Sequence, residues 1–374
     1  MVFFTSHLLS LFTILYVFAG VASAGIIKPR SFSGSNLYYA PGLSKAQRTV
    51  LLDGMQSAGM KVLRVWISAQ TTASTKNTTI TPYNSVEPDT IGVYDDTVLE
   101  LLDDFMLDSF ARGIKLIISM HSYNSLASGD VYSDTYGVEG FYENTTAQAQ
   151  FDARLVHIMN HKHKTLRLAW KYLSPFIFAF EAENEAMIGL GQQYIVDHPQ
   201  WQCDRATTIK NQLPKGSNIM VTTGGASWLD ESVQQGWLDC PAIDIVAVHA
   251  YGAGDLNTTK IESYVDLAKA AGSRLMFQEW GACYYDTANN VCDYGDALDV
   301  ATRNANIALW ADQITAAGLP WLYWQVLPNA DPHYDYDYEI GVNTDPSWPT
   351  LKKAALRAAV APAAFDFSDC FLGL

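Results

Sequence analysis

Short apolar, β-branched runs alternate along this sequence with longer segments whose apolar residues recur at helical spacing. The short runs predict eight strands, at residues 32–38, 62–67, 115–120, 176–181, 219–223, 243–249, 275–279 and 321–326. The longer segments predict helices at residues 44–58, 95–112, 147–172, 203–212, 260–271, 296–317 and 349–361. A shorter helix is expected in "WLDESVQQGWLD", between the fifth and sixth strands.

Residues typical of helix ends occur where these helices begin and stop. Ser44 and Asp95 occupy the expected N-cap positions. Four glycines follow the expected last turns, and they are Gly59, Gly113, Gly272 and Gly318. These signals support the order strand–helix repeated along the chain.

Eight βα units predict one closed (β/α)8 barrel, an α/β fold of the TIM-barrel type. Strands that are apolar throughout and separated by helices form parallel sheets that are buried on both faces. Eight such strands within 374 residues favour a closed barrel over an open sheet. No G-x-G-x-x-G follows the first strand and no GxxxxGK[ST] occurs, so the phosphate cradle of a nucleotide-binding fold is missing. We expect a single domain over residues 25–374.

The first 24 residues predict a signal peptide. Residues 8–21 are apolar but too short to span a bilayer comfortably, and Ala22-Ser23-Ala24 forms an A-x-A cleavage site. The preceding segment has His7 but no Lys or Arg, so an uncleaved anchor is the alternative. The expected location is therefore secreted and extracellular.

Secretion would place the five cysteines in an oxidising compartment. Cys283 and Cys292 would close a short loop, Cys203 and Cys240 are a plausible second pair, and Cys370 is left over, although sequence alone leaves the connectivity open. Three N-x-T sequons are candidate glycan acceptors on surface loops, at Asn77, Asn144 and Asn257.

The formal charge of −15 excludes some classes of partner. Binding of nucleic acid or anionic lipid needs a basic surface, so neither nucleic acid nor a membrane is an expected partner.

A monomer is the default expectation. No CxxC spacing suggests zinc, and no cofactor or metal is expected. His157 and His161 lack the intervening glutamate of H-E-x-x-H and favour a solvated helix face. The carboxylates of "DPHYDYDYEIG", residues 331–341, could bind calcium, but their interleaved tyrosines suit a sugar-contacting loop better.

Polar and aromatic side chains gather at the carboxyl ends of the predicted strands, where a barrel of this kind places its catalytic groups. They are Arg64 and Trp66, His121, Asn184 and Glu185, His249 and Tyr251, Glu279 and Trp280, and Trp324. Glu185 and Glu279 lie on the fourth and seventh strands, so they can face each other across the mouth. Two facing carboxyl groups, one protonated and one ionised, can cleave a glycosidic bond.

The order of these motifs resembles that of a retaining glycoside hydrolase of clan A, most closely glycoside hydrolase family 5, the endo-glucanase and endo-mannanase family. The likeness runs through the whole mature chain. It implies that Glu185, in the Asn184-Glu185 pair, is the acid/base and that Glu279, in "EWG", is the nucleophile. It further implies that Arg64 keeps the nucleophile ionised and that other strand-end residues contact the substrate or line the site: His121, Asn184, His249, Tyr251 and Trp324. Trp66 and Trp280 are further substrate-binding candidates, and packing in the core is the alternative for both.

Physical chemistry fits these implied roles. Arg64 is expected to lower the pKa of Glu279 by Coulomb attraction and hydrogen bonding, whereas Glu185 is expected to keep a raised pKa. Glu185 is preferred over Glu181 and Glu183 because it follows Asn184, and one of the other two is expected to be buried in the barrel.

The expected substrate is a β-linked polysaccharide. The start "GSNLYYAPGLS" and the segment "GMKVLRVWI" resemble family members that act on mannan, so endo-β-1,4-mannanase is the first choice. β-1,4-Glucanase, β-1,3- or β-1,6-glucanase and galactanase remain open, because loops shape the pocket. A catalytically inactive barrel that only binds glycans is the alternative of another class.

Overall fold

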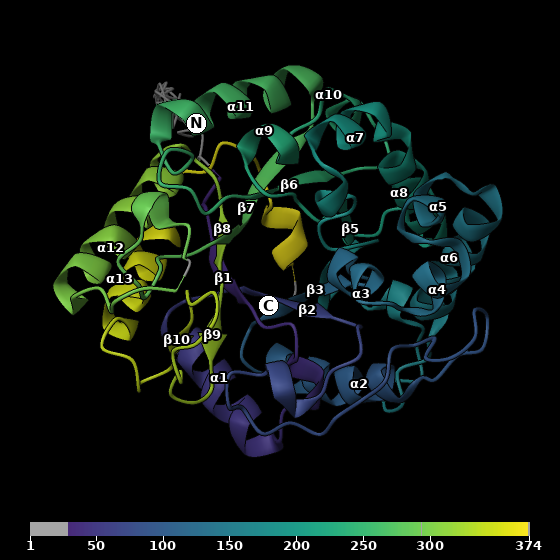
Figure 1. Ribbon diagram of the computed structural model, residues 1–374, viewed down its shortest axis with the longest axis horizontal. Helices are drawn as coiled ribbons and strands as arrows, with labels where there is room; N and C mark the ends of the chain where they lie inside the picture. The colour runs from purple at the N-terminus through teal and green to yellow at the C-terminus, as the bar shows by residue number, and fades with distance from the viewer. Residues whose placement is uncertain (1–28, 293, 373–374) are drawn as a thin grey trace, which may run out of the picture.

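The computed structural model describes residues 29–292 and 294–372, so the predicted signal peptide lies outside the described residues. Eight parallel strands form a closed barrel in chain order, and β8 pairs back with β1 (Figure 1). The strands are β1 Ser33–Asn36, β2 Val62–Trp66, β3 Lys115–Ser119, β4 Ile177–Glu181, β5 Met220–Thr222, β6 Ile245–His249, β7 Arg274–Trp280 and β8 Trp321–Tyr323. The predicted (β/α)8 barrel is confirmed.

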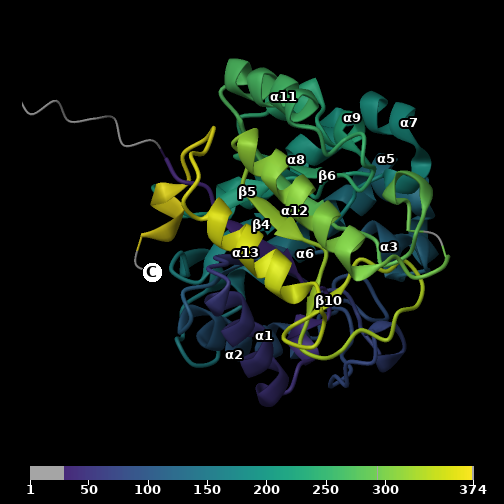
Figure 2. The same cartoon turned by 90° about the vertical axis from the view of Figure 1, so that its left-hand side faces the viewer.

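Helices surround the barrel, because each strand buries both of its faces and needs a layer of apolar side chains outside it. The helices are α1 Lys45–Ser57, α2 Thr97–Phe110, α3 Tyr123–Ala127, α4 Val131–Tyr136, α5 Val138–Glu143, α6 Thr145–Asn160, α7 Gln192–Asp197, α8 Pro199–Gln212, α9 Leu229–Ser232, α10 Gln235–Leu238, α11 Thr258–Ala271, α12 Val300–Ala316 and α13 Trp348–Ala358. The last two pack side by side on the outside of the barrel (Figure 2). Two short strands, β9 Val326–Leu327 and β10 Ile340–Gly341, form a separate ribbon after β8.

The helix ends follow the expected chemistry at most positions. Ser44 forms a capping box with Gln47, and all four expected C′ glycines have positive φ. At the start of α2 the N-cap is Asp96 rather than Asp95, although the Asp95 carboxylate accepts a hydrogen bond from the backbone N–H of Thr97.

The predicted helix at residues 147–172 is wrong in its second half, because α6 ends at Asn160. Beyond it the chain turns over the buried carboxylate of Asp103. That carboxylate contacts the His161 ring at 3.1 Å and accepts hydrogen bonds from the Lys164 backbone at 2.7 Å and from the Trp170 indole at 2.8 Å. Satisfying a buried charge outweighs continuation of the helix here. The side chain of His161 is therefore only 8% exposed, so the expected solvated face is wrong for this histidine.

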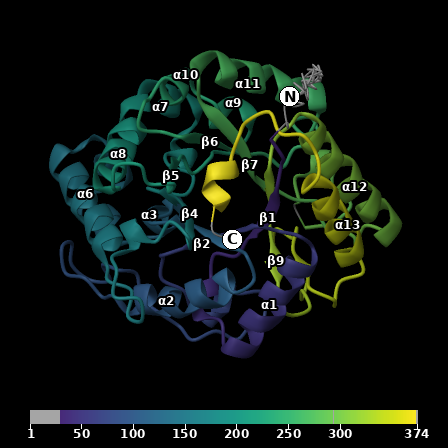
Figure 3. The same cartoon turned by 180° about the vertical axis from the view of Figure 1, so that it is seen from behind.

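The C-terminal segment closes the end of the barrel opposite the strands' carboxyl ends (Figure 3). Phe371 packs on Phe32, with ring centroids 5.1 Å apart, and also on Phe178 at 5.6 Å. Cys370, in the same segment, is buried and unpaired. Aromatic side chains thus pack at this end of the barrel, and the polar side chains predicted to form the site lie at the other end.

Two disulfides join the pairs expected from the sequence, Cys203–Cys240 and Cys283–Cys292. The three sequon asparagines are exposed, as a glycan acceptor must be. Among the described residues, no helix combines the length and apolar character needed to cross a bilayer.

Candidate active site

Two carboxyl groups meet at the carboxyl ends of β4 and β7. One oxygen of Glu185 and one of Glu279 lie within 4.8 Å of each other. The Nδ1 atom of His249, at the end of β6, approaches both of them, at 3.0 Å from Glu185 and 3.5 Å from Glu279. The sequence analysis predicted that these residues would converge, and the structure brings all three together.

The backbone of Glu185 leaves the strand direction before it reaches this point. Strand β4 ends at Glu181, and Glu185 has φ +52°, a left-handed conformation that is unfavourable for a residue with a side chain. Its N–H donates to the carbonyl of Gly224 at 3.0 Å. A side chain at Gly224 would come within 1.9 Å of the Glu183 carbonyl, so only glycine permits this approach.

Glu279 is surrounded by hydrogen-bond donors. It accepts from Arg64 at 2.5 Å and from the Tyr251 hydroxyl at 2.7 Å, and its side chain is 5% exposed. Burial raises the pKa of Glu279, whereas His249, Arg64 and the hydrogen bond from Tyr251 each act to lower it. Arg64 therefore acts in the predicted sense, but the net direction is upward and not downward as expected.

Glu185 has less compensation for its burial. Burial raises the pKa of Glu185 to about 7, against weaker opposing effects from Arg64 and Asn184. Among the described residues, its side chain contacts the Asn184 amide, a donor at 3.5 Å, and the Nδ1 atom of His249 at 3.0 Å. Below neutral pH, Glu185 therefore keeps its proton, in agreement with the raised pKa expected from the sequence.

A hydrogen-bond chain fixes which nitrogen of His249 carries the hydrogen. Arg64 can only donate, and it binds Glu181 at 2.6 and 3.0 Å. The Gln278 amide donates to Glu181 at 3.0 Å, so its oxygen is the acceptor that faces His249 Nε2 at 2.9 Å. Burial lowers the pKa of His249, which keeps the ring neutral. The hydrogen therefore sits on Nε2, and the lone pair of Nδ1 points at Glu185 and Glu279.

The lone pair on Nδ1 of His249 can only accept a hydrogen bond, so a neighbouring group must donate one. Two ionised carboxylates facing it would leave three acceptors in contact with no hydrogen between them. A proton on Glu185, the closer of the two groups, resolves the conflict. The arrangement therefore supplies one protonated and one ionised carboxyl group a few ångströms apart.

His121 lies between two other carboxylates. Its Nδ1 is 2.7 Å from Glu183 and its Nε2 is 2.7 Å from Asp130, the N-cap of α4. Burial alone would lower the pKa of His121. The hydrogen bonds to both carboxylates outweigh burial and raise this pKa to about 9. Glu183 also accepts from Tyr142 at 2.9 Å, which ties this charged cluster to α5.

A cleft of about 1010 Å³ opens beside these groups. Its aromatic wall is formed by Trp324, Trp66 and Tyr38, and the last ring stacks on Trp324 at 5.8 Å with 9° between the planes. His121 and Asn184 line it as well. Such a wall gives a pyranose ring flat apolar surfaces at the side of the two glutamates.

Four predicted substrate-binding residues do not line the cleft. Arg64, His249 and Tyr251 instead contact Glu279, whereas Trp280 reaches neither the cleft nor the two glutamates. It is fully buried and packs edge-on against Trp321 and Tyr323. Strand alternation explains this, since Glu279 and its successor point to opposite faces of β7.

A sequence model of the cellulases, glycosyl hydrolase family 5, matches residues 27–330. The chain belongs to this family. It is therefore a glycoside hydrolase, and the resemblance drawn from the strand-end motifs is confirmed.

Curated relatives of this family 5 hydrolase come from filamentous fungi. The mannan endo-1,4-β-mannosidase F of Aspergillus fumigatus is 25% identical over 276 residues, which cover 67% of this chain and 60% of that protein. The probable mannan endo-1,4-β-mannosidase F of Aspergillus flavus is 27% identical over 341 residues, covering 84% of this chain and 67% of that protein. This chain thus spans about 60% of the length of the first of these relatives.

Solved structures with the same fold include two mannanases. The endo-β-1,4-mannanase of Thermotoga petrophila gives a TM-score of 0.70 at 19% identity, over 89% of this chain and 77% of that one. The endo-1,4-β-mannanase of Rhizomucor miehei gives 0.64 at 19% identity, over 89% and 96%. At such identities the likeness shows the fold alone.

Several residues of this hydrolase's site were not singled out from the sequence. One of Glu181 and Glu183 was expected to be buried, and both are; their pairing with Arg64 and His121 was not predicted. Gln278 was not noticed, although a glutamine inside an otherwise apolar strand is a signal of a buried hydrogen bond. Asp130 gave no signal, because the helices after β3 were not predicted.

Two groups of described side chains have the composition and spacing of metal ligands. One is the trio Glu185, His249 and Glu279 at the strand ends, and the other is Asp331, His333 and Asp337. The first trio is accounted for by the proton placement described above. The second lies outside the cleft and has no part in that chemistry.

Proposed function

We propose that this chain is a secreted, retaining endo-β-mannanase that cleaves β-1,4-mannan, with Glu185 as acid/base and Glu279 as nucleophile. The observation that carries the proposal is the close pair of carboxyl groups with unequal surroundings. An oxygen–oxygen separation within 4.8 Å agrees with the roughly 5 Å of retaining glycosidases and is too short for the water that an inverting enzyme needs.

The proposed reaction has two displacements. Glu279 attacks the anomeric carbon while Glu185 gives its proton to the glycosidic oxygen, and the carbon–oxygen bond breaks to leave a covalent glycosyl-enzyme. Glu185, now ionised, takes a proton from water, which attacks the same carbon and releases Glu279. Arg64 and Tyr251, both bound to Glu279, stabilise its charge before and after the covalent step.

The choice of mannan rests on the named activities of the relatives. The Aspergillus fumigatus protein is named a mannan endo-1,4-β-mannosidase and the Aspergillus flavus protein a probable one, and the cleft's aromatic wall suits a β-linked chain of pyranoses. Because identity is near 25% and loops form the cleft, β-1,4-glucan, β-1,3- or β-1,6-glucan and galactan are the competing substrates.

Secretion is proposed on independent grounds. Two disulfides are expected in an oxidising compartment, and the exposed sequons are compatible with passage through the secretory route. The partner is the polysaccharide itself, and a monomer is proposed.

The test is release of reducing sugar from a panel containing mannan, galactomannan, β-1,4-glucan, β-1,3-glucan and galactan. We expect the highest kcat/KM on the mannans. Glu185→Gln and Glu279→Gln should each reduce it by at least about 100-fold, the scale of a lost acid/base or nucleophilic group. Glu262→Gln, an exposed glutamate on α11, is the matched control and should match wild type.

Proton NMR of the first products supplies the stereochemical test, and retention predicts that the β-anomer appears first. The α-anomer appearing first would contradict the covalent intermediate. A preference for another polysaccharide would overturn the mannan assignment alone. No release from any substrate would instead favour a glycan-binding barrel.

A further inference from the structure

The loop between β9 and β10 gathers three potential metal ligands outside the cleft. His333 Nδ1 lies 2.9 Å from an oxygen of Asp337 and 3.7 Å from Oδ2 of Asp331. The side chains of Asp337 and Asp331 are 0% and 1% exposed, whereas that of His333 is 31% exposed. The cluster is thus an acidic site closed on the protein side and open at the imidazole.

Two carboxylate oxygens in this cluster have no hydrogen-bond partner. Asp331 Oδ2, the atom that faces His333, and Asp337 Oδ1 are both buried and unsatisfied. Two buried carboxylates in contact repel each other unless a proton or a cation lies between them.

The nearby basic side chains do not fill that role. Arg303 donates to the carbonyls of Tyr338 and Glu339 and to Asp345. Lys76 binds backbone carbonyls of the same loop and lies 3.5 Å from Glu339. Arg303 and Lys76 are thus held by other acceptors and give no hydrogen bond to the two unsatisfied oxygens, so among the described residues the basic side chain that contacts both aspartates is His333 itself.

We propose that Asp331, His333 and Asp337 bind one divalent transition-metal ion of the Zn²⁺ type. Ligand atoms about 2.1 Å from a tetrahedral ion are roughly 3.4 Å apart, and the observed 2.9 and 3.7 Å bracket that value. One imidazole and two carboxylates are ligands for Zn²⁺ or Mn²⁺, whereas Ca²⁺ requires six or more oxygens. Water completes the shell on the exposed side of His333.

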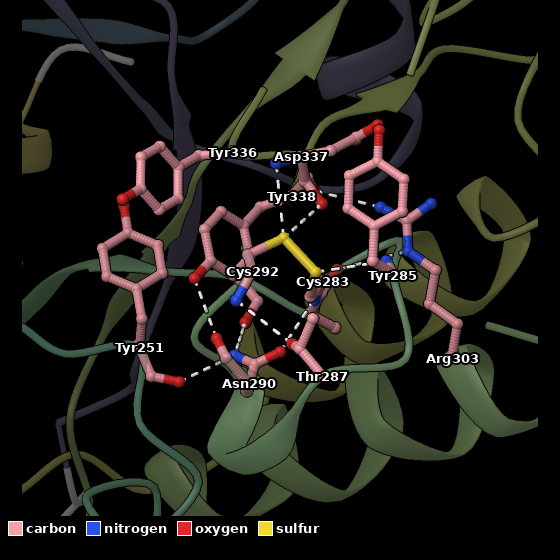
Figure 4. Close-up of a disulfide and its surroundings, with 12 residues drawn as sticks. Tyr251, Cys283, Tyr285, Thr287, Asn290, Cys292, Arg303, Tyr336, Asp337 and Tyr338 are labelled. Carbon is pink, nitrogen blue, oxygen red and sulfur yellow. Dashed lines mark hydrogen bonds between the residues drawn. A yellow bond between two sulfur atoms is a disulfide. The ribbon is translucent and has the colours of Figure 1, made fainter. Parts of the chain in front are cut away.

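The ion would brace the loop against the disulfide segment. The Asp337 N–H donates to the sulfur of Cys292 at 3.3 Å (Figure 4), and Tyr284, next to Cys283, stacks on the His333 ring at 3.6 Å. The next residue, Tyr338, packs on Tyr251 with ring centroids 4.6 Å apart. A cation here therefore stabilises the fold close to the catalytic groups and takes no part in the cleavage.

The experiment uses the full chain treated with EDTA and then titrated with Zn²⁺, Mn²⁺ or Ca²⁺ near pH 7.5. We expect saturable binding of one Zn²⁺ at micromolar concentration. At about 100 times the Kd, Tm should rise by about 4 °C. Ca²⁺ should give a much smaller response.

Asp331→Asn separates this site from the trio at the strand ends, which can also attract Zn²⁺. The variant keeps the side-chain shape and lets an amide face Asp337, so its metal-free Tm should equal or exceed that of wild type while the response to Zn²⁺ disappears. Asp335→Asn, an exposed position with φ +55° on the same loop, is the matched control and should respond like wild type. An equal Zn²⁺ response in Asp331→Asn, or no saturable binding to wild type at millimolar Zn²⁺, would overturn the proposal.

Discussion

A neutral imidazole decides which of the two facing carboxyl groups holds a proton. His249 presents a lone pair to Glu185 because its other nitrogen is engaged by Gln278, which is in turn oriented by Glu181 and Arg64. The donor and acceptor roles along this row of hydrogen bonds are set by Arg64, because its guanidinium group can only donate. The protonation state of Glu185 at the mouth therefore depends on Arg64, which is four side-chain contacts away along this row.

Gln278→Met tests this positioning role. Without the acceptor at Nε2, His249 can carry its hydrogen on Nδ1 and donate it to the Glu185 carboxylate, which favours the ionised form. We expect the alkaline limb of the pH profile of kcat/KM, near pH 7 in wild type, to move down by about one unit.

Gln278→Glu is the companion variant. It keeps an acceptor for Nε2 and adds negative charge, so the alkaline limb should stay in place or move up. A merely structural role predicts something else, namely that both variants lose activity at every pH with the limb unmoved.

The turns that follow the strands shape the site as much as the strands do. The βα pattern predicted which strand carries which side chain, because apolar runs and helical spacing are local signals. It did not predict the left-handed turn at Glu185 or helices α3 to α5, which supply Asp130 and Tyr142. These features depend on contacts between segments far apart in the sequence, for which periodicity carries no signal.

Gly225→Ala tests the turn after β5. Gly225 has φ +69°, and an added Cβ would come within 2.2 Å of the His249 ring. The ring must then move, so kcat/KM should fall by at least about 10-fold, together with a loss of stability of about 1–3 kcal/mol. Activity assays and thermal unfolding measure the two effects.

Gly216→Ala is the control for backbone strain. It has φ +80°, and nothing lies within 4 Å of the added atom. This variant should lose stability and retain kcat/KM. Equal loss of activity in both variants would contradict a specific contact with His249.

The whole barrel encloses a charged centre within an apolar shell. Arg64, Glu181, Glu183 and Glu279 are all nearly or fully buried, at the end opposite the phenylalanines of the C-terminal segment. The sequence predicted that the polar groups gather at the mouth, but not that the C-terminal phenylalanines close the floor. It could not predict how the buried charges balance, because the order of pKa values depends on distances of a few ångströms.

That balance makes the stability of the molecule depend on pH through Glu185. The pKa of Glu185 in the folded chain, about 7, lies above its ordinary value of 4.5. The contribution of Glu185 to the free energy of unfolding is therefore fully present below about pH 4.5 and is lost as pH rises through 7. Glu185→Gln has no such loss. Between pH 4.5 and 7, the free energy of unfolding of the variant should rise relative to that of wild type. Above pH 7 the difference should stay at roughly 3 kcal/mol, or about 4 °C in Tm. Thermal unfolding from pH 4 to 8 measures the difference, with Glu262→Gln as the exposed control. Parallel curves for wild type and Glu185→Gln would show that Glu185 ionises at the same pH in the folded and unfolded chain, and the proton that the reaction requires would then have to come from another group.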